Sequence, residues 1–290
     1  MPRTSHRSRD DANHNFVTHE FAAEIVRRVS VALGDNARVT PMKGALLART
    51  YYEDVSQRPM SDVDVLVTDI SLRKSLHELK RAGFVRVGVS SDLGVRTLSH
   101  PCAPELLLDL HRFPLPLGLG RVTNAWFLVD ARADDSLFGA RVFIPTRTRL
   151  LAHTLGVIAN DDVYRAHAHT LEDVNRLARA QNVDEDVRTI SDAGLRIAAV
   201  LALKRVCEEK PSSAASALLT AIELTAAERR FAARLHAELV RLRYTPERAL
   251  RGKIVSRFVA DTYALRARSV LSAGLGKAQA LLLNRWRNSP

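Results

Sequence analysis

Residues 62–67 read Asp-Val-Asp-Val-Leu-Val, an alternation of carboxylate and apolar side chains with an apolar end. Such alternation is typical of a β-strand, because successive side chains point to opposite faces of the sheet. Asp62 and Asp64 therefore share one face, and Val63 and Val65 share the other. The two carboxylates would lie about 6–7 Å apart along the strand, and they repel each other unless a cation lies between them. The stretch predicts a strand with a candidate metal-binding face.

A third carboxylate, Asp109, lies inside the apolar run 106–111. A lone acid in an apolar strand is costly unless it is paired or binds a metal. His111 comes two residues later and shares the face of Asp109. Carboxylate oxygens are the ligands that Mg²⁺ prefers, usually one or two per ion together with substrate phosphates. The pattern makes Asp62, Asp64 and Asp109 candidate metal ligands.

Lys43 and Gly44 precede a predicted helix that runs from Ala45 to about Glu53. A glycine allows the backbone to come close to a phosphate at a helix N-terminus. The lysine offers a positive charge to the same phosphate. The alternative is a simple turn with a solvated lysine.

The character of the chain changes at Pro145. Before it, short apolar segments alternate with turns; after it, Ala, Leu and Arg are abundant and Gly and Pro are sparse. We predict a disordered tail over 1–14, an α+β domain over 15–145 and a helical domain over 146–290. The predicted strands are 62–67, 84–89, 95–100, 106–111 and 141–144. The predicted helices are 16–32, 45–53, 71–82 with Ser71 as N-cap, 147–159, 161–181, 185–209, 212–222, 225–243, 246–268 and 273–287.

The chain is basic, with 43 Lys and Arg against 32 Asp and Glu and a net charge of +11. Most of the excess lies in residues 231–290, which carry 12 Lys and Arg against 3 acids. This distribution favours an anionic partner, either a nucleic acid or an acidic membrane surface. A solvated, arginine-rich face remains the alternative.

Composition excludes several classes of protein. Apolar residues make up 46% of the chain, which excludes wholesale disorder. The sequence contains no run of about 18 apolar residues, so no transmembrane helix is predicted. The polar N-terminus does not resemble a secretory signal. Cys102 and Cys207 match no metal or redox spacing, so a reducing cytoplasm suits them best. We expect a cytoplasmic location.

The order of these motifs resembles the bacterial nucleotidyltransferases of the polymerase-β-like superfamily. Their pattern is a Lys-Gly, a helix with a Tyr, an Arg, an Asp-x-Asp on a strand and later an Asp-x-His. The stretch 41–67 and the string Leu108-Asp109-Leu110-His111 carry the resemblance, which covers about residues 40–160. Better-known members place a Gly-Ser about ten residues before the acidic pair. Here Lys43-Gly44-Ala45 takes that place, and the gap is longer.

The resemblance implies a mixed sheet with flanking helices, followed here by the helical domain. It also implies a transfer, dependent on Mg²⁺ or Mn²⁺, of a nucleoside monophosphate from a nucleoside triphosphate such as ATP to an acceptor hydroxyl. Two cations would be held by Asp62, Asp64 and Asp109. Lys43, Gly44 and Arg58 would bind the nucleotide, with Arg58 placed in the loop just before the acidic strand. His111 would be auxiliary.

The acceptor stays open at this point. One candidate is the 3′ end of a tRNA, as in the type IV toxin nucleotidyltransferases that share this core, and a cognate antitoxin would then be a partner. The basic C-terminal helices could contact a structured RNA. A protein side chain or a small hydroxylated metabolite is another candidate acceptor. The alternative from a different class is a catalytically silent relative that binds a nucleotide or a partner protein.

Overall fold

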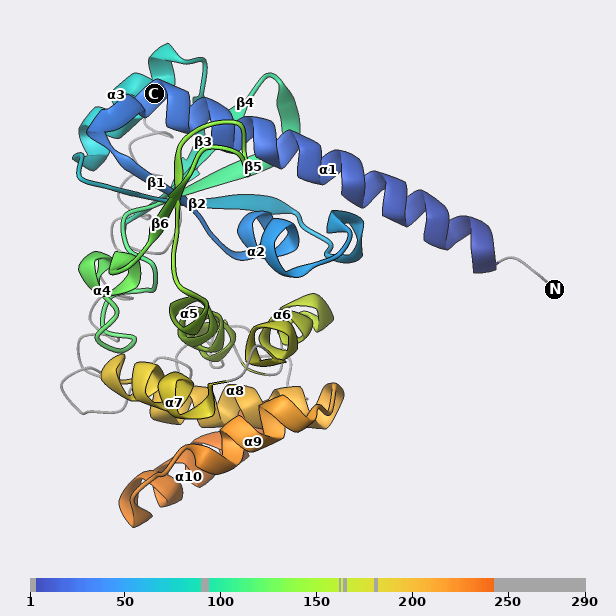
Figure 1. Cartoon of the computed structure of the whole chain (residues 1–290), viewed down its shortest axis with the longest axis vertical. Helices are drawn as coiled ribbons and strands as arrows, with labels where there is room; N and C mark the ends of the chain where they lie inside the picture. The colour runs from blue at the N-terminus through green and yellow to red at the C-terminus, as the bar shows by residue number, and fades with distance from the viewer. Residues whose placement is uncertain (1–3, 90–93, 162, 164–165, 180–181, 243–290) are drawn as a thin grey trace, which may run out of the picture. The chain divides into compact units, whose positions relative to one another are not determined.

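A computed structural model describes residues 4–89, 94–161, 163, 166–179 and 182–242 of the chain. It divides into two compact units. The first unit comprises the chain up to Phe113 together with Leu128–Pro145, and the second comprises Pro114–Phe127 and the chain from Thr146 onward. The first contains a mixed sheet with flanking helices and the second is helical (Figure 1). The α+β class expected from the sequence is confirmed.

The first unit is built on a five-stranded sheet of order β1-β2-β5-β4-β3. Its strands are β1 (Arg38–Pro41), β2 (Asp62–Thr68), β3 (Val85–Val89), β4 (Val95–His100) and β5 (Ala103–His111). Only β2 and β5 pair in parallel, and the other neighbours are antiparallel. A parallel pair needs a crossover between its strands, and here the crossover contains α3 (Leu72–Arg81), β3 and β4. The acidic strand thus lies directly beside the strand of Asp109.

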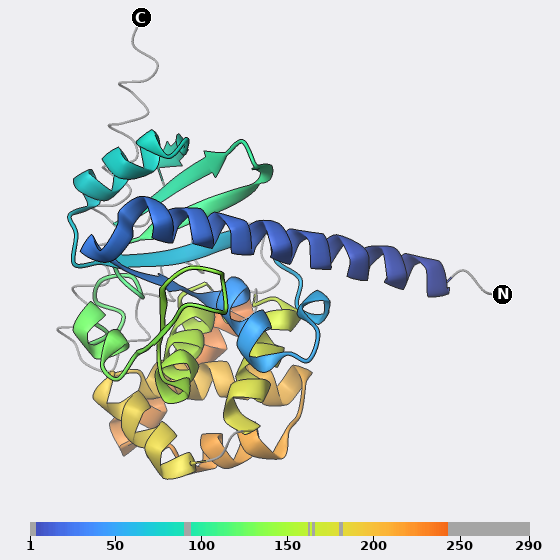
Figure 2. The ribbon, with the colours of Figure 1, turned by 45° about the horizontal axis from the view of Figure 1, so that its top comes forward.

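One face of this sheet is covered by α1 (Thr4–Leu33), which runs across it (Figure 2). The side chains that alternate with the acids on β2 and β5 are buried on this side, as are the apolar residues of α1. They are Val63, Val65, Leu108 and Leu110 from the strands and Ile25, Val26 and Val29 from the helix. The acidic side chains therefore lie on the opposite face, where α2 (Lys43–Tyr51) begins.

The remaining elements of the first unit are short. A two-stranded sheet pairs β6 (Arg132–Asp134) with β7 (Val142–Ile144), and single 3₁₀ turns cover Gly34–Asn36 and Val55–Gln57. The Ser71 hydroxyl accepts a hydrogen bond from the Lys74 amide and caps α3, which confirms the predicted N-cap.

The second unit packs its helices against α8 (Arg196–Glu209), whose apolar residues are buried on most sides. Its other long helices are α5 (Arg147–Asn160), α6 (Ala168–Arg179), α7 (Val183–Asp192), α9 (Ser213–Ala221) and α10 (Ala226–Leu242), and α4 (Asn124–Leu128) is a single short turn. The buried imidazole of His153 bonds to the Pro114 carbonyl at 2.8 Å, a structural contact. None of the helices in the described ranges has the length and apolar character needed to cross a membrane.

Two helices differ clearly from those predicted. Helix α1 begins at Thr4, whereas a disordered tail was expected over 1–14. Residues 4–14 have no apolar face, so hydrophobic periodicity does not reveal the helix there, but they also contain no Gly or Pro that would end a helix. The predicted helix 185–209 is two helices, because Gly194 adopts a left-handed φ of 66° between α7 and α8.

Other differences are smaller. Helix α6 begins at Ala168 rather than 161, and β5 begins at Ala103 rather than 106, while α4 and β6 were not predicted. The predicted helices 246–268 and 273–287 lie outside the described residues.

Leu107 and Leu108 are neighbours on β5 that face opposite sides of the sheet, and they are 37% and 1% exposed. We predict that Leu108→Ala lowers the free energy of unfolding by about 2–5 kcal/mol, because it leaves a cavity under α1. Leu107→Ala should cost less than about 1 kcal/mol. Urea unfolding of both variants, followed by circular dichroism, measures the difference. Equal losses would contradict the assignment of the two faces.

Candidate metal and nucleotide site

The acid-bearing face of the sheet brings two carboxylates together. In the parallel register of β2 and β5, Asp64 lies opposite Asp109, and Leu66 lies opposite His111. The Thr97 hydroxyl, on β4, donates a hydrogen bond to Asp109 Oδ1 at 2.7 Å. Three neighbouring strands therefore position the acids, and their relative placement is fixed by the hydrogen-bond ladder of the sheet.

Asp64 is 3% exposed, so its charge is almost removed from water. Two groups compensate it at one oxygen: Lys43 Nζ donates to Asp64 Oδ1 at 2.7 Å, and His111 Nε2 bonds to the same oxygen at 2.8 Å. Burial acts to raise the pKa of Asp64, but the Lys43 ammonium and the hydrogen bond from His111 outweigh it and hold the pKa well below its usual range.

The ionised state of Asp64 also fixes the role of His111. A carboxylate can only accept a hydrogen bond, so Nε2 of His111 must carry a proton and donate it. A histidine that donates to a metal-binding carboxylate orients that carboxylate and strengthens its hold on the metal. The geometry thus gives His111 a positioning contact with Asp64.

The donor set of the site suits a divalent cation. One ligand atom each from Asp64, Asp109 and His111 can be chosen so that all three lie within 4.8 Å of one another. Two carboxylates are suitable for Mg²⁺ or Mn²⁺, whereas the Nε2 atom of His111, which donates its proton to Asp64, is not free to bind the cation. The residues present therefore fit the cation that the motif implies.

Asp62 lies outside this group of three. It is the first residue of β2 and is partly exposed, and it accepts a hydrogen bond from the Ser61 hydroxyl at 3.3 Å. Burial and the charges of Asp64 and Asp109 raise the pKa of Asp62 against the effect of Lys43. Asp62 is therefore electrostatically coupled to the pair, and its role as a metal ligand stays a prediction.

Lys43 reaches Asp64 from a strained backbone position. It is the first residue of α2, follows the extended Met42 and has a φ of 46°, a left-handed conformation that is uncommon for a residue other than glycine. The Met42 amide donates to the Asp64 carbonyl at 2.9 Å, which ties the start of α2 to β2. The local conformation thus keeps the ammonium of Lys43 beside the acidic pair.

Gly44 and Arg58 are brought together in a way that the sequence did not indicate. A Cβ atom on Gly44 would lie 2.5 Å from Arg58 Nη1, so any larger residue would require the guanidinium to move from its present position. Arg58 is 5% exposed, and its Nη1 donates to the Pro59 carbonyl at 2.7 Å. The side chain of Arg58 packs under the start of α2 as a fixed positive charge, and a phosphate contact from either residue stays a prediction.

The loop that carries Arg58 is held by α1. His19 Nε2 hydrogen-bonds to the Arg58 carbonyl at 2.7 Å, and Asn15 Nδ2 donates to the Ser56 carbonyl at 3.0 Å. Burial lowers the pKa of His19 below its ordinary value, so the ring is neutral near pH 7. His19 was not singled out from the sequence, although it lies three residues before the buried Ala22, on the covered side of the helix.

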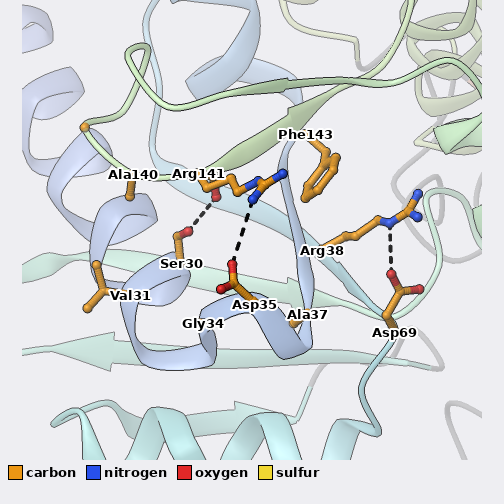
Figure 3. A pocket seen from close by; sticks show the side chains of 11 residues that line it. Ser30, Val31, Gly34, Asp35, Ala37, Arg38, Asp69, Ala140, Arg141 and Phe143 are labelled. Carbon is orange, nitrogen blue, oxygen red and sulfur yellow. Dashed lines mark hydrogen bonds and ion pairs between the residues drawn. The ribbon is translucent and has the colours of Figure 1, made fainter.

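A separate pocket of about 570 Å³ lies in the first unit, away from these acids (Figure 3). The guanidinium groups of Arg38 and Arg141 flank the ring of Phe143 at 5.4 and 6.0 Å from its centroid. Arg38 pairs with Asp69 at 2.9 Å, and Arg141 approaches Asp35 at 4.0 Å. Because the guanidinium groups of both arginines already face a carboxylate, this pocket is a weaker candidate for the functional site.

Comparison with protein families agrees with this geometry. A family described as "Uncharacterised nucleotidyltransferase" matches residues 6–207, more than two thirds of the chain. The chain belongs to this nucleotidyltransferase family. The match covers the sheet with its acidic pair and continues through α5, α6 and α7 into α8. Membership supports a transferase activity. No curated protein matches the chain.

Metal binding by Asp64 and Asp109 can be measured directly. We predict that Asp64→Asn or Asp109→Asn removes Mn²⁺ binding, because each replaces a carboxylate ligand by a neutral amide. His111→Ala should weaken Mn²⁺ binding by about 10–100-fold, the usual effect of losing an orienting partner. His111→Gln offers a replacement N–H donor and should restore part of the loss. Isothermal titration of the full chain with Mn²⁺ measures these affinities.

Asp135→Asn is the matched control, because Asp135 is an exposed acid of the same unit. Unchanged Mn²⁺ affinity in both the Asp64 and the Asp109 variants would contradict the assignment of the site.

Proposed function

We propose that this protein transfers a nucleoside monophosphate from a nucleoside triphosphate to an acceptor hydroxyl, in a reaction that depends on Mg²⁺ or Mn²⁺. The observation that carries the proposal is the pairing of the buried Asp64 with the half-buried Asp109, in parallel register, with Lys43 and His111 hydrogen-bonded to Asp64. A buried carboxylate beside a second, half-buried one is costly to keep and has a clear use in holding cations.

Each residue has a distinct part in this proposal. Asp64 and Asp109 hold the cation, and Asp62 completes the set from the edge of β2. A divalent cation bound there would lower the pKa of the acceptor hydroxyl and neutralise negative charge on the leaving pyrophosphate. Lys43 neutralises the triphosphate, with Arg58 adding a fixed positive charge behind Gly44. Asp109, whose Oδ1 accepts a hydrogen bond from Thr97, would lie nearest the attacking oxygen.

Positioning and electrostatics perform most of such a reaction, because phosphoryl chemistry needs little covalent help from the protein. The rigid placement of the acids on adjacent strands is suited to this task. A sheet holds its side chains in fixed register, so the two carboxylates keep their separation when substrates bind.

For the acceptor we propose a structured RNA, with the 3′ end of a tRNA as the specific candidate. The support is the sequence charge: residues 243–290 carry 10 Lys and Arg against 2 acids. Such a segment favours phosphate backbones. A toxin-like role with a cognate antitoxin and a cytoplasmic location would accompany this acceptor.

Transfer of a labelled nucleotide tests the reaction. The full chain, incubated with each α-³²P-labelled NTP, Mg²⁺ or Mn²⁺ and total cellular RNA, should label RNA. Asp64→Asn and Asp109→Asn should each lower the rate at least about a hundredfold, because each removes a ligand for the cation that stabilises the developing charge. The Asp62→Asn variant decides whether Asp62 belongs to the same set. Asp135→Asn should retain the wild-type rate.

The label also separates the acceptors. Label on protein or on a small metabolite instead of RNA would replace the RNA proposal and keep the transferase. Tight nucleotide binding without transfer to RNA, protein or metabolite extract would identify a catalytically silent relative.

The basic segment predicts a salt-dependent contact with RNA. Substitution of Arg248, Arg251, Lys253 and Arg257 by Gln should weaken tRNA binding and flatten its dependence on salt. Each lost phosphate contact lowers the slope of log K against log salt by about 0.7–0.9. Filter binding at several salt concentrations measures the slope. An unchanged slope would show that these four cations form a solvated face.

A further inference from the structure

One oxygen of Asp64 is already fully engaged. Asp64 Oδ1 accepts a hydrogen bond from the Lys43 ammonium at 2.7 Å and another from His111 at 2.8 Å. A carboxylate oxygen offers two lone pairs, so a further cation can bind at Oδ1 only after one of these donors leaves. The acid that is central to the metal site therefore carries an internal cation as its partner.

Lys43 is the donor that can leave. Its side chain is 32% exposed, whereas that of His111 is 13% exposed and extends from the ladder of β5. A lysine ammonium is carried by a flexible four-carbon stem. The ammonium can thus turn toward another anion without disturbing the packed sheet, while His111 keeps its hold on Asp64.

We propose that Lys43 couples nucleotide binding to cation binding by exchanging its partner. A triphosphate draws the ammonium away from Asp64 Oδ1, and the released lone pair becomes available to the divalent cation. Lys43 thus competes with the cation until nucleotide arrives. This inference rests on the proposed function, because it requires the triphosphate to lie beside Lys43.

The exchange leaves the buried carboxylate compensated in both arrangements. Removing the partner of a buried charge is destabilising, so the departure of Lys43 from Asp64 is favoured when another cation takes its place. The backbone near Lys43 stays fixed, because the Met42 amide is bonded to the Asp64 carbonyl at 2.9 Å. Only the side chain beyond Cα has to move.

Direct binding of Mn²⁺ tests the coupling without relying on catalysis. The probe is Mn²⁺ alone, titrated into the full chain with and without an α,β-methylene analogue of ATP, which cannot transfer its nucleoside monophosphate. The electron paramagnetic resonance signal of free Mn²⁺, corrected with a titration of the analogue without protein because its phosphates also bind Mn²⁺, reports the fraction bound to the protein. In the wild type, the analogue should tighten Mn²⁺ binding.

Lys43→Met should tighten Mn²⁺ binding in the absence of the analogue by about tenfold, within the range of about 5–150-fold typical of coupled sites. The factor by which the analogue tightens Mn²⁺ binding should shrink by the same amount, because the variant has no ammonium at Asp64 for the analogue to draw away. Lys80→Met removes an equal charge from an exposed position on α3 and should leave both affinities unchanged.

A second variant protects the test from misfolding. Glycine adopts a φ of 46° without strain, so Lys43→Gly removes the ammonium and relieves the backbone at the same time. It should bind Mn²⁺ as tightly as Lys43→Met does. Circular dichroism and thermal melting confirm that both variants are folded.

The failures are distinguishable. If folded Lys43→Met and Lys43→Gly bind Mn²⁺ no more tightly than the wild type, while Asp64→Asn abolishes binding, the exchange is overturned and the metal site survives. If the wild type binds no more Mn²⁺ than Asp64→Asn, with or without the analogue, the proposed function itself is contradicted.

Discussion

The negative charge of Asp64 lies where almost no water reaches it, and it has to be compensated by the protein. Three parts of the fold meet that requirement: α2 supplies Lys43, β5 supplies His111, and the sheet supplies the position. Loss of one partner of a buried ion pair costs about 3–5 kcal/mol. The arrangement of the acidic face is therefore tied to the stability of the first unit, and a single substitution there changes stability as well as binding.

A second set of contacts supports the start of α2, next to the acidic site. Helix α1 holds the loop of Arg58 through His19 and Asn15, and the guanidinium of Arg58 fills the space that Gly44 leaves open. The start of α2 is thus fixed from two sides, by β2 on one and by this loop on the other. In the Lys43-Gly44 motif, the glycine therefore has a role in packing, because it leaves space for Arg58, in addition to any role in binding phosphate.

The alternation of residues 62–67 was sufficient to predict the strand and the shared face of its acids, since that periodicity is local. The pairing of β2 with β5 is not local, so the sequence did not show it directly. Asp109 was connected to the site by two arguments: the cost of a lone acid in an apolar strand, and the family pattern. Three features depend on tertiary packing, which sequence spacing does not reveal. They are the contact of His111 with Asp64, the position of Asp62 at the start of its strand and the hydrogen bond of His19 to the loop of Arg58. The start of α1 was missed because its polar first turns have no apolar periodicity.

The parallel pairing of β2 and β5 has a consequence for the newly made chain. Asp64 and His111 are 47 residues apart, and α3, β3 and β4 lie between them. Contacts of such sequence separation form late in folding, because the intervening loop must close first. A ribosome-bound chain that has not yet been extended past His111 lacks one side of the acidic face. The pairing of Asp64 with Asp109 and His111 therefore forms only after the chain has been made through β5.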